Sequence, residues 1–236
     1  MQIEAVKVRR LYLEVASQIE EMITSGSIKP GERLPAERNL AVSFKVSRPT
    51  IREAMIALEI AGLVEIRTGS GIYALAPKGS SLEGELANDG PGPFEILESR
   101  LLIEVETVVL AATRISKAQL KELEQALLEM EQGDNGRITE QADKRFHCII
   151  GEASQNSALA SVVEWLWELR NKSKISTIFH RRVREEGVHP SMDEHRRIFQ
   201  ALKNRNPVQA REAMRTHIAN AIEADMALLE TDNKND

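Results

Sequence analysis

Residues 34–75, LPAERNLAVSFKVSRPTIREAMIALEIAGLVEIRTGSGIYAL, decide the fold of the first part of the chain. A short helix fits 36–44, and Ser47 is a good N-cap for a second helix over 48–61, which Gly62 ends. The strings LVEIR and IYAL then flank TGSG, which predicts a β-hairpin with a flexible tip. The order of these elements predicts a helix-turn-helix followed by a hairpin.

Positive charge gathers on the same stretch. The chain has 31 Lys and Arg against 36 Asp and Glu, and its net charge of −5, if evenly spread, would argue against nucleic acid. Residues 38–52, however, carry four cations and no acid. These cations are Arg38, Lys45, Arg48 and Arg52. The first turn of a recognition helix enters the major groove, where arginine bonds to guanine and serine or threonine reaches phosphates or bases. The pattern therefore favours DNA binding over a solvated helix face.

The composition limits the class of protein. A chain of 236 residues suits one or two domains, and 42% hydrophobic residues are too many for a disordered chain. The one cysteine, Cys148, cannot form an internal disulfide. No apolar run approaches the roughly 18 residues of a membrane helix, and the first residues lack the plan of a secretory signal. We expect a cytoplasmic protein without membrane association.

A change of composition divides the chain. Residues 76–93, APKGSSLEGELANDGPGP, have the glycine, proline and serine content of a linker. The sequence predicts a DNA-binding domain over 1–75, this linker, and an all-α helical bundle over 94–236, so the fold class is mostly α. We expect bundle helices at about 94–113, 116–132, 138–153, 157–185, 191–203 and 207–230.

All five histidines lie in the expected bundle. Asp143 and His147 are four residues apart and share one helix face, while His195 and His217 lie on two further helices. Such nitrogen and oxygen ligands suit Zn²⁺, Ni²⁺, Mn²⁺ or Fe²⁺, and helical bundles build metal sites in their interiors. Spacing alone favours isolated polar histidines, because only the Asp143–His147 pair is local.

The paired strings LPAER and SRPTIREA resemble the winged helix-turn-helix of GntR-type bacterial transcription regulators, over about residues 9–75. In that family the arginine of PAER, the first turns of the recognition helix and a glycine at the wing tip contact DNA. Pro49 stands where many relatives have threonine, and Glu37 is interpreted as a helix-start residue. The contacts that the resemblance implies are Arg38, Ser47, Arg48, Thr50, Arg52 and Gly69.

The order DxxFH, DEHxxIxxAL and MxxH resembles the FCD effector domain of the FadR subgroup, many members of which hold a divalent metal. The resemblance implies a site with Zn²⁺ as first choice and Ni²⁺, Mn²⁺ or Fe²⁺ as alternatives. His180 and His189 match no ligand position, so we expect them at the surface or in loops. The implied metal ligands are Asp143, His147, His195 and His217.

Residues 92–104 and 151–167 resemble the hexuronate-responsive branch, the ExuR and UxuR type of regulator. That resemblance implies a small carboxylic acid effector, such as a hexuronate or related sugar acid, held beside the metal. Arg100 is the first candidate to pair with its carboxylate. An ion pair with Glu104 at i+4 accounts for Arg100 equally well, and Arg170 is a second candidate for the pocket.

These observations predict a regulator rather than an enzyme. We expect a repressor that binds a two-fold symmetric operator as a homodimer, because one recognition helix covers only a few base pairs. Two alternatives stay open, a metalloenzyme with an accessory DNA-binding domain and a metal-ion sensor. The absence of a recognisable base or nucleophile pattern counts against catalysis.

Overall fold

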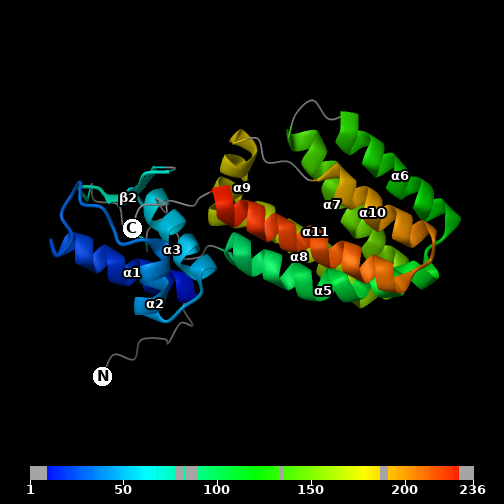
Figure 1. The fold of residues 1–236 in the computed structure, drawn as a ribbon, viewed down its shortest axis with the longest axis horizontal. Coiled ribbons are helices and arrows are strands. Elements are labelled where there is room, and N and C mark those ends of the chain that lie inside the picture. The colour runs from blue at the N-terminus through cyan, green and yellow to red at the C-terminus, as the bar shows by residue number, and fades with distance from the viewer. Residues whose placement is uncertain are drawn as a thin grey trace, which may run out of the picture. The chain divides into compact units, whose positions relative to one another are not determined.

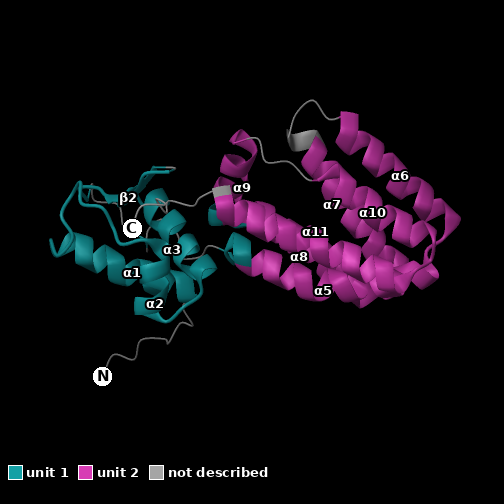
Figure 2. Ribbon diagram, viewed as in Figure 1, with its two compact units in different colours: residues 1–94, 173–175, 229–236 teal, residues 95–172, 176–228 magenta. Residues whose placement is uncertain are grey.

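In a computed structural model, the described residues are 10–67, 69–77, 82, 90–132, 136–186 and 191–228 (Figure 1). They form two compact units, and each is described by itself. The first holds the residues up to Phe94 together with Ser173–Ile175, and the second holds those within 95–172 and 176–228 (Figure 2). Helices dominate both units, which confirms the mostly α fold. Most of the expected linker, and His189, lie outside the described residues.

The first unit contains the expected helix-turn-helix. Helix α1 (Leu11–Thr24) packs its buried face against α3 (Arg48–Ile60), and α2 (Glu37–Phe44) also contacts α3. Lys45 adopts a left-handed conformation, with φ 56°, that ends α2. Two residues later Ser47 caps α3 by accepting a hydrogen bond from the Thr50 amide, so a tight turn joins the two helices.

A hairpin follows α3. Strand β1 (Val64–Arg67) pairs antiparallel with β2 (Gly71–Ala74), with Val64 opposite Ala74. The backbone at position 71 has φ +132°, a conformation that L side chains rarely adopt, and a Cβ there would lie 2.4 Å from Nε of Arg33, so that side chain would have to move. The backbone conformation at the start of β2 therefore favours glycine.

The second unit is all helical in its described residues. Its core is built from apolar faces that repeat at helical spacing, and α6 packs on α7, α7 on α8 and α10 on α11. Within the described part of the chain, no helix has both the length and the apolar character needed to cross a membrane. The helices are α5 (Pro93–Arg114), α6 (Lys117–Gln132), α7 (Gly136–Ala153), α8 (Ser157–Lys172), α9 (Lys174–Glu185), α10 (Met192–Lys203) and α11 (Pro207–Leu228).

The expectation of one helix over 157–185 was wrong, because the helix breaks at Ser173. The hydroxyl of Thr177 donates to the carbonyl of Asn171 at 3.4 Å, which supplies a partner for a backbone oxygen at the end of α8. In a continuous helix Arg170 and His180 would stand about 15 Å apart along the axis. Across the break, Nη2 of Arg170 lies 3.3 Å from Nδ1 of His180.

Candidate DNA-binding surface, metal centre and cavity

The start of α3 presents polar side chains to solvent. Ser47 is exposed, and its hydroxyl oxygen lies 3.2 Å from the amide of Thr50 and 2.8 Å from the Thr50 hydroxyl. Arg48 is half-buried, while Arg38 on α2 and Gly69 in the hairpin turn are exposed. Because Gly69 has φ +70°, the turn adopts a conformation that L side chains rarely take. These positions suit the DNA contacts expected from the sequence.

Arg52 differs from its neighbours. Its side chain is only 1% exposed, its Nε donates to Oε1 of Glu37 at 2.9 Å, and its Nη2 donates to the other oxygen of the same carboxylate. A guanidinium held in this way by a buried carboxylate is not presented to DNA. We correct the expectation for Arg52, which joins α3 to α2 and so positions the recognition helix. Glu37 is the first residue of α2, in agreement with its helix-start interpretation.

Three helices bring the four expected metal ligands together. Asp143 and His147 project from α7, His195 from α10 and His217 from α11, and all four side chains are buried. One possible ligand atom from each residue lies within 4.8 Å of all the others. This separation allows one ion to contact all four side chains.

The three imidazoles share one hydrogen-bond pattern. Each places its Nδ1 against a carboxylate or carbonyl oxygen, which can only accept, so Nδ1 carries the hydrogen when the ring is neutral. Nε2 then keeps its lone pair. Metal-binding histidines are oriented by partners of this kind. The pairs are His147 with Glu104, His195 with the Ser191 carbonyl at 2.9 Å, and His217 with Glu194 at 3.0 Å.

The centre of this cluster fits a cation. Nε2 of His147 is buried, has no hydrogen-bond partner in the part of the chain that the structure describes, and lies 3.4 Å from Oδ1 of Asp143. Nε2 of His195 lies 2.9 Å from the same oxygen. A ring nitrogen with a lone pair and a carboxylate oxygen are both acceptors, and a shared metal ion satisfies both. The buried cluster of one aspartate and three histidines is therefore suited to a divalent metal.

The groups around the cluster keep its two buried carboxylates ionised. Burial alone would raise the pKa of Asp143, but the neighbouring imidazoles of His147 and His195 hold it well below its ordinary value. Burial also acts to raise the pKa of Glu104, yet the charge of Arg100 and its contact with His147 lower it to about 2. For His217, burial lowers the pKa to about 4 despite the bond to Glu194. At neutral pH both carboxylates are ionised and His217 is neutral, as metal coordination requires. Burial acts to lower the pKa of His147, but Glu104 and Asp143 raise it, so a metal ion would compete with a proton at this ring.

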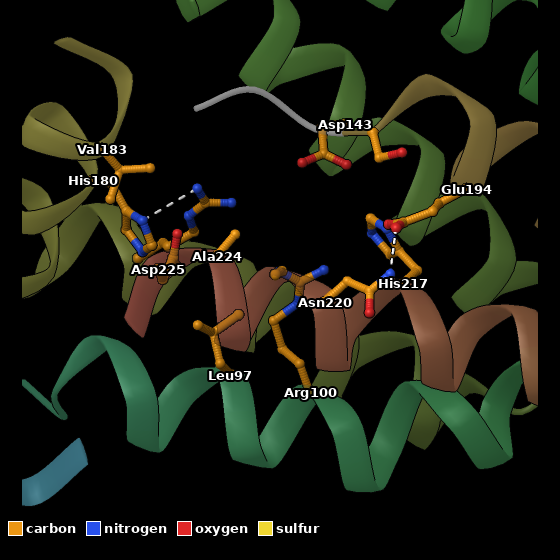
Figure 3. A pocket seen from close by; sticks show the side chains of 13 residues that line it. Leu97, Arg100, Asp143, His180, Val183, Glu194, His217, Asn220, Ala224 and Asp225 are labelled. Carbon is orange, nitrogen blue, oxygen red and sulfur yellow. Dashed lines mark hydrogen bonds and ion pairs between the residues drawn. The ribbon is translucent and has the colours of Figure 1, made fainter. Parts of the chain in front are cut away.

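A cavity of about 210 Å³ opens beside the cluster (Figure 3). Asp143, Glu194 and His217 lie at one end, and His180 and Asp225 lie at the other. The walls come from α5, α7, α8, α9, α10 and α11. The remaining lining residues are Leu97, Arg100, Arg170, Val183, Ser191, Asn220, Ala221 and Ala224.

Both candidate arginines line this cavity. Nε of Arg100 donates to Oε1 of Glu104 at 2.7 Å, so Arg100 makes the i+4 ion pair and faces the cavity as well. The buried Trp167 supports both guanidinium groups, whose carbons lie 4.0 Å (Arg100) and 5.1 Å (Arg170) from its ring centroid. Two cations therefore line the cavity that opens beside the cluster.

The far end of the cavity is lined by His180 and Asp225, neither of which the sequence predicted at this site. His180 was expected at the surface or in a loop, and this was wrong, because it is 4% exposed and faces the cavity from α9. The break at Ser173 explains the error. Asp225 was not singled out, although it lies eight residues after His217 and so falls on the same broad side of α11, about 80° further around the axis. That periodicity was the available signal.

Comparison with known proteins agrees with both units. Residues 11–74 match the family "Bacterial regulatory proteins, gntR family", and residues 95–220 match the "FCD domain". The chain belongs to the GntR family of bacterial transcription regulators. It is a DNA-binding regulator with an FCD domain, and the matched proteins are regulators rather than enzymes, as the sequence predicted.

Two similar proteins come from Escherichia coli (strain K12). The Exu regulon transcriptional regulator is 36% identical over 222 residues, which are 92% of this chain and 85% of that protein. The Uxu operon transcriptional regulator is 34% identical over 241 residues, which are 98% and 92% of the two chains. Both matches agree with the resemblance to the ExuR and UxuR branch.

A solved structure of a GntR family member from Pseudomonas syringae pv. tomato str. DC3000 shares the fold. It has a TM-score of 0.51 at 19% identity, and the match covers 91% of this chain and 84% of that one.

Proposed function

We propose that this GntR-family regulator is a repressor that releases its operator when a small carboxylic acid binds beside a divalent metal in the helical unit. One observation carries the proposal: a single cavity reaches both the buried His–Asp cluster and two arginines. The resemblance to hexuronate-responsive regulators, with the matches to the Exu and Uxu regulators, supports a hexuronate or related sugar acid. As a DNA-binding protein of a bacterial family, it would act in the cytoplasm.

The metal would be held by Asp143, His147, His195 and His217, with Zn²⁺ as the first candidate and Ni²⁺, Mn²⁺ or Fe²⁺ as alternatives. When bound, the ion supplies positive charge and open coordination positions for a carboxylate and a neighbouring hydroxyl. Arg100 lines the same cavity and can donate to a carboxylate oxygen, and Arg170 adds a second positive charge. An anion entering this cavity therefore meets complementary charge.

The DNA contacts that we propose are those at the exposed start of α3, on α2 and at the hairpin turn. A homodimer would double the few base pairs that one recognition helix contacts. An effector can change operator affinity only through its different affinity for two arrangements of the dimer. The proposed DNA-contacting residues are Arg38, Ser47, Arg48, Thr50 and Gly69.

The test uses the full chain, loaded with Zn²⁺ or stripped by a chelator, and a duplex selected by the protein from random sequence. Fluorescence anisotropy follows DNA release on adding D-glucuronate, D-galacturonate or lactate, and sedimentation gives the number of protomers on the duplex. We expect a two-protomer complex that an acid dissociates only when the protein holds metal.

His195→Ala provides the matched variant. It should bind the duplex as tightly as the wild type, contain less metal by mass spectrometry, and fail to release DNA with the acid. Release by metal without any acid would favour a metal sensor instead, and conversion of the acid to a product would favour an enzyme. Full metal content and normal release in His195→Ala would contradict the metal assignment.

A further inference from the structure

The far end of the cavity contains a buried carboxyl group without a partner. Asp225 is 6% exposed, lines the cavity from α11, and makes no hydrogen bond or ion pair with any residue that the structure describes. A buried carboxylate without a partner destabilises a fold. Here burial raises the pKa of Asp225 to about 6, although the charges of Arg170 and Arg100 act in the opposite direction. Because no described residue forms a hydrogen bond or ion pair with this carboxyl group, a bound ligand could supply the missing hydrogen bond.

The neighbouring imidazole supplies a hydrogen-bond donor. Nη2 of Arg170 lies 3.3 Å from Nδ1 of His180, and a guanidinium can only donate, so Nδ1 of His180 accepts. Burial and the charges of Arg170 and Arg100 lower the pKa of His180 well below its ordinary value, so the ring is neutral. A neutral imidazole that accepts at Nδ1 carries its hydrogen on Nε2. His180 is then a donor at the end of the cavity that also contains the acceptor Asp225 (Figure 3).

An acceptor and a donor at one end of a cavity match a hydroxyl group, which donates and accepts at once. The apolar side chains of Leu97, Val183 and Ala224 line the same cavity and suit the C–H faces of a carbon chain. Two arginines make an ammonium group unfavourable there, since both carry positive charge. The volume of about 210 Å³ is below the range typical of drug-sized ligands, so the cavity suits a small metabolite.

We propose that Asp225 and His180 form a hydroxyl-binding subsite that selects polyhydroxylated acids over short or unsubstituted ones. The proposal rests on the proposed function, in which the carboxylate of the same effector binds at the metal end. An acid long enough to span the cavity would place its distal hydroxyls at Asp225 and His180. A short hydroxy acid such as lactate would occupy the metal end alone.

The experiment is calorimetric titration of the Zn²⁺-loaded full chain with D-glucuronate and separately with lactate. The wild type is compared with Asp225→Ala, Asp225→Asn and His180→Phe, and with Glu223→Gln as the control, because Glu223 is an exposed carboxylate on the same helix. We expect Asp225→Ala and His180→Phe to weaken glucuronate binding about tenfold or more and to leave lactate binding unchanged. Asp225→Asn keeps an acceptor oxygen and should lose less, and Glu223→Gln should match the wild type.

The outcomes separate the two proposals. Failure of both acids to bind the wild type would overturn the proposed function together with the subsite. Wild-type binding of both acids, with glucuronate affinity unchanged in Asp225→Ala and His180→Phe, would overturn only the subsite. A parallel loss of both acids in these variants would also overturn it, because it would indicate a structural effect on the whole cavity. Metal content and circular dichroism of each variant confirm that the fold and the cluster are intact.

Discussion

Two buried charged side chains, Arg52 in the first unit and Asp225 in the second, differ in whether the fold gives them a partner. In the first, the guanidinium of Arg52 is fully buried and meets the carboxylate of Glu37 through two hydrogen bonds. In the second, the carboxyl of Asp225 is almost as buried and meets no partner within the described residues. A satisfied buried pair has a structural role, because it orients one helix against another. An unsatisfied buried acid that lines a cavity lowers stability, and this cost agrees with the ligand-binding role that we propose for Asp225.

The largest effect is expected from breaking the satisfied pair. Arg52→Ala leaves the carboxylate of Glu37 buried without its partner, which should destabilise the first unit by about 3–5 kcal/mol. Chemical unfolding followed by circular dichroism measures the change. The double variant Glu37→Leu with Arg52→Met should recover much of the loss, since it leaves no unpaired charge. An unchanged unfolding curve for Arg52→Ala would contradict the structural role.

Removing the unsatisfied acid Asp225 should increase the free energy of unfolding, whereas breaking the Arg52–Glu37 pair should decrease it. The pKa of Asp225 is about 6 in the folded protein against an ordinary 3.8, so the folded state holds its proton more tightly. The contribution of Asp225 to stability is therefore intact below about pH 4 and is lost as the pH rises through 6. Asp225→Asn should raise the free energy of unfolding at pH 8 by about 3 kcal/mol at most, with the gain vanishing at pH 4.

The measurement is urea unfolding of both proteins with chelator present across this pH range. Glu223→Gln on the same helix is the control, because this carboxylate is exposed and its replacement should leave the unfolding curve close to that of the wild type. If Asp225→Asn gains nothing at pH 8, Asp225 has a partner that offsets its burial, and the contrast with Arg52 disappears.

Glu104 is a buried carboxylate in the second unit that, unlike Asp225, has partners. Arg100 bonds to one of its oxygens and Nδ1 of His147 contacts the other. Glu104→Gln should weaken metal binding by roughly 10–100-fold, since it removes the charged partner that orients a ligand. Competition with a fluorescent chelator measures the affinity. Glu106→Gln, on the exposed side of the same helix, should bind metal as the wild type does. Equal affinities in the two variants would remove Glu104 from the metal site.

Arg48 and Arg52 lie on the same helix, α3, but Arg48 is half-buried whereas Arg52 is fully buried. Arg48→Ala should reduce binding of the selected duplex by about 1–3 kcal/mol while the unfolding curve stays unchanged. Gel shift and circular dichroism together distinguish this result from the unfolding expected for Arg52→Ala. Full-strength DNA binding by Arg48→Ala would contradict its assignment to the interface.

Several features could be predicted from the sequence because they depend on neighbours along the chain. The serine cap of α3, the apolar spacing of Ile51, Met55 and Leu58, and the glycine-rich turn of the hairpin are local signals, and the structure contains each corresponding element. The four residues of the metal cluster followed from a family resemblance. Spacing along the chain identified only the Asp143–His147 pair, since i+4 is the one relation that a single helix determines.

Only the tertiary structure decided which side chains meet across elements. Whether Arg52 contacts DNA or Glu37 depends on how α2 packs on α3, and the two residues are 15 positions apart. His180 reaches the cavity because α8 ends before Ser173, a break that helical periodicity did not reveal. The residues next to Asp225 in the sequence do not indicate whether a cation from another helix pairs with it. Periodicity identifies the face of a helix, but the partner across that face is set by the packing of distant segments, and that packing left Asp225 unpaired beside a cavity.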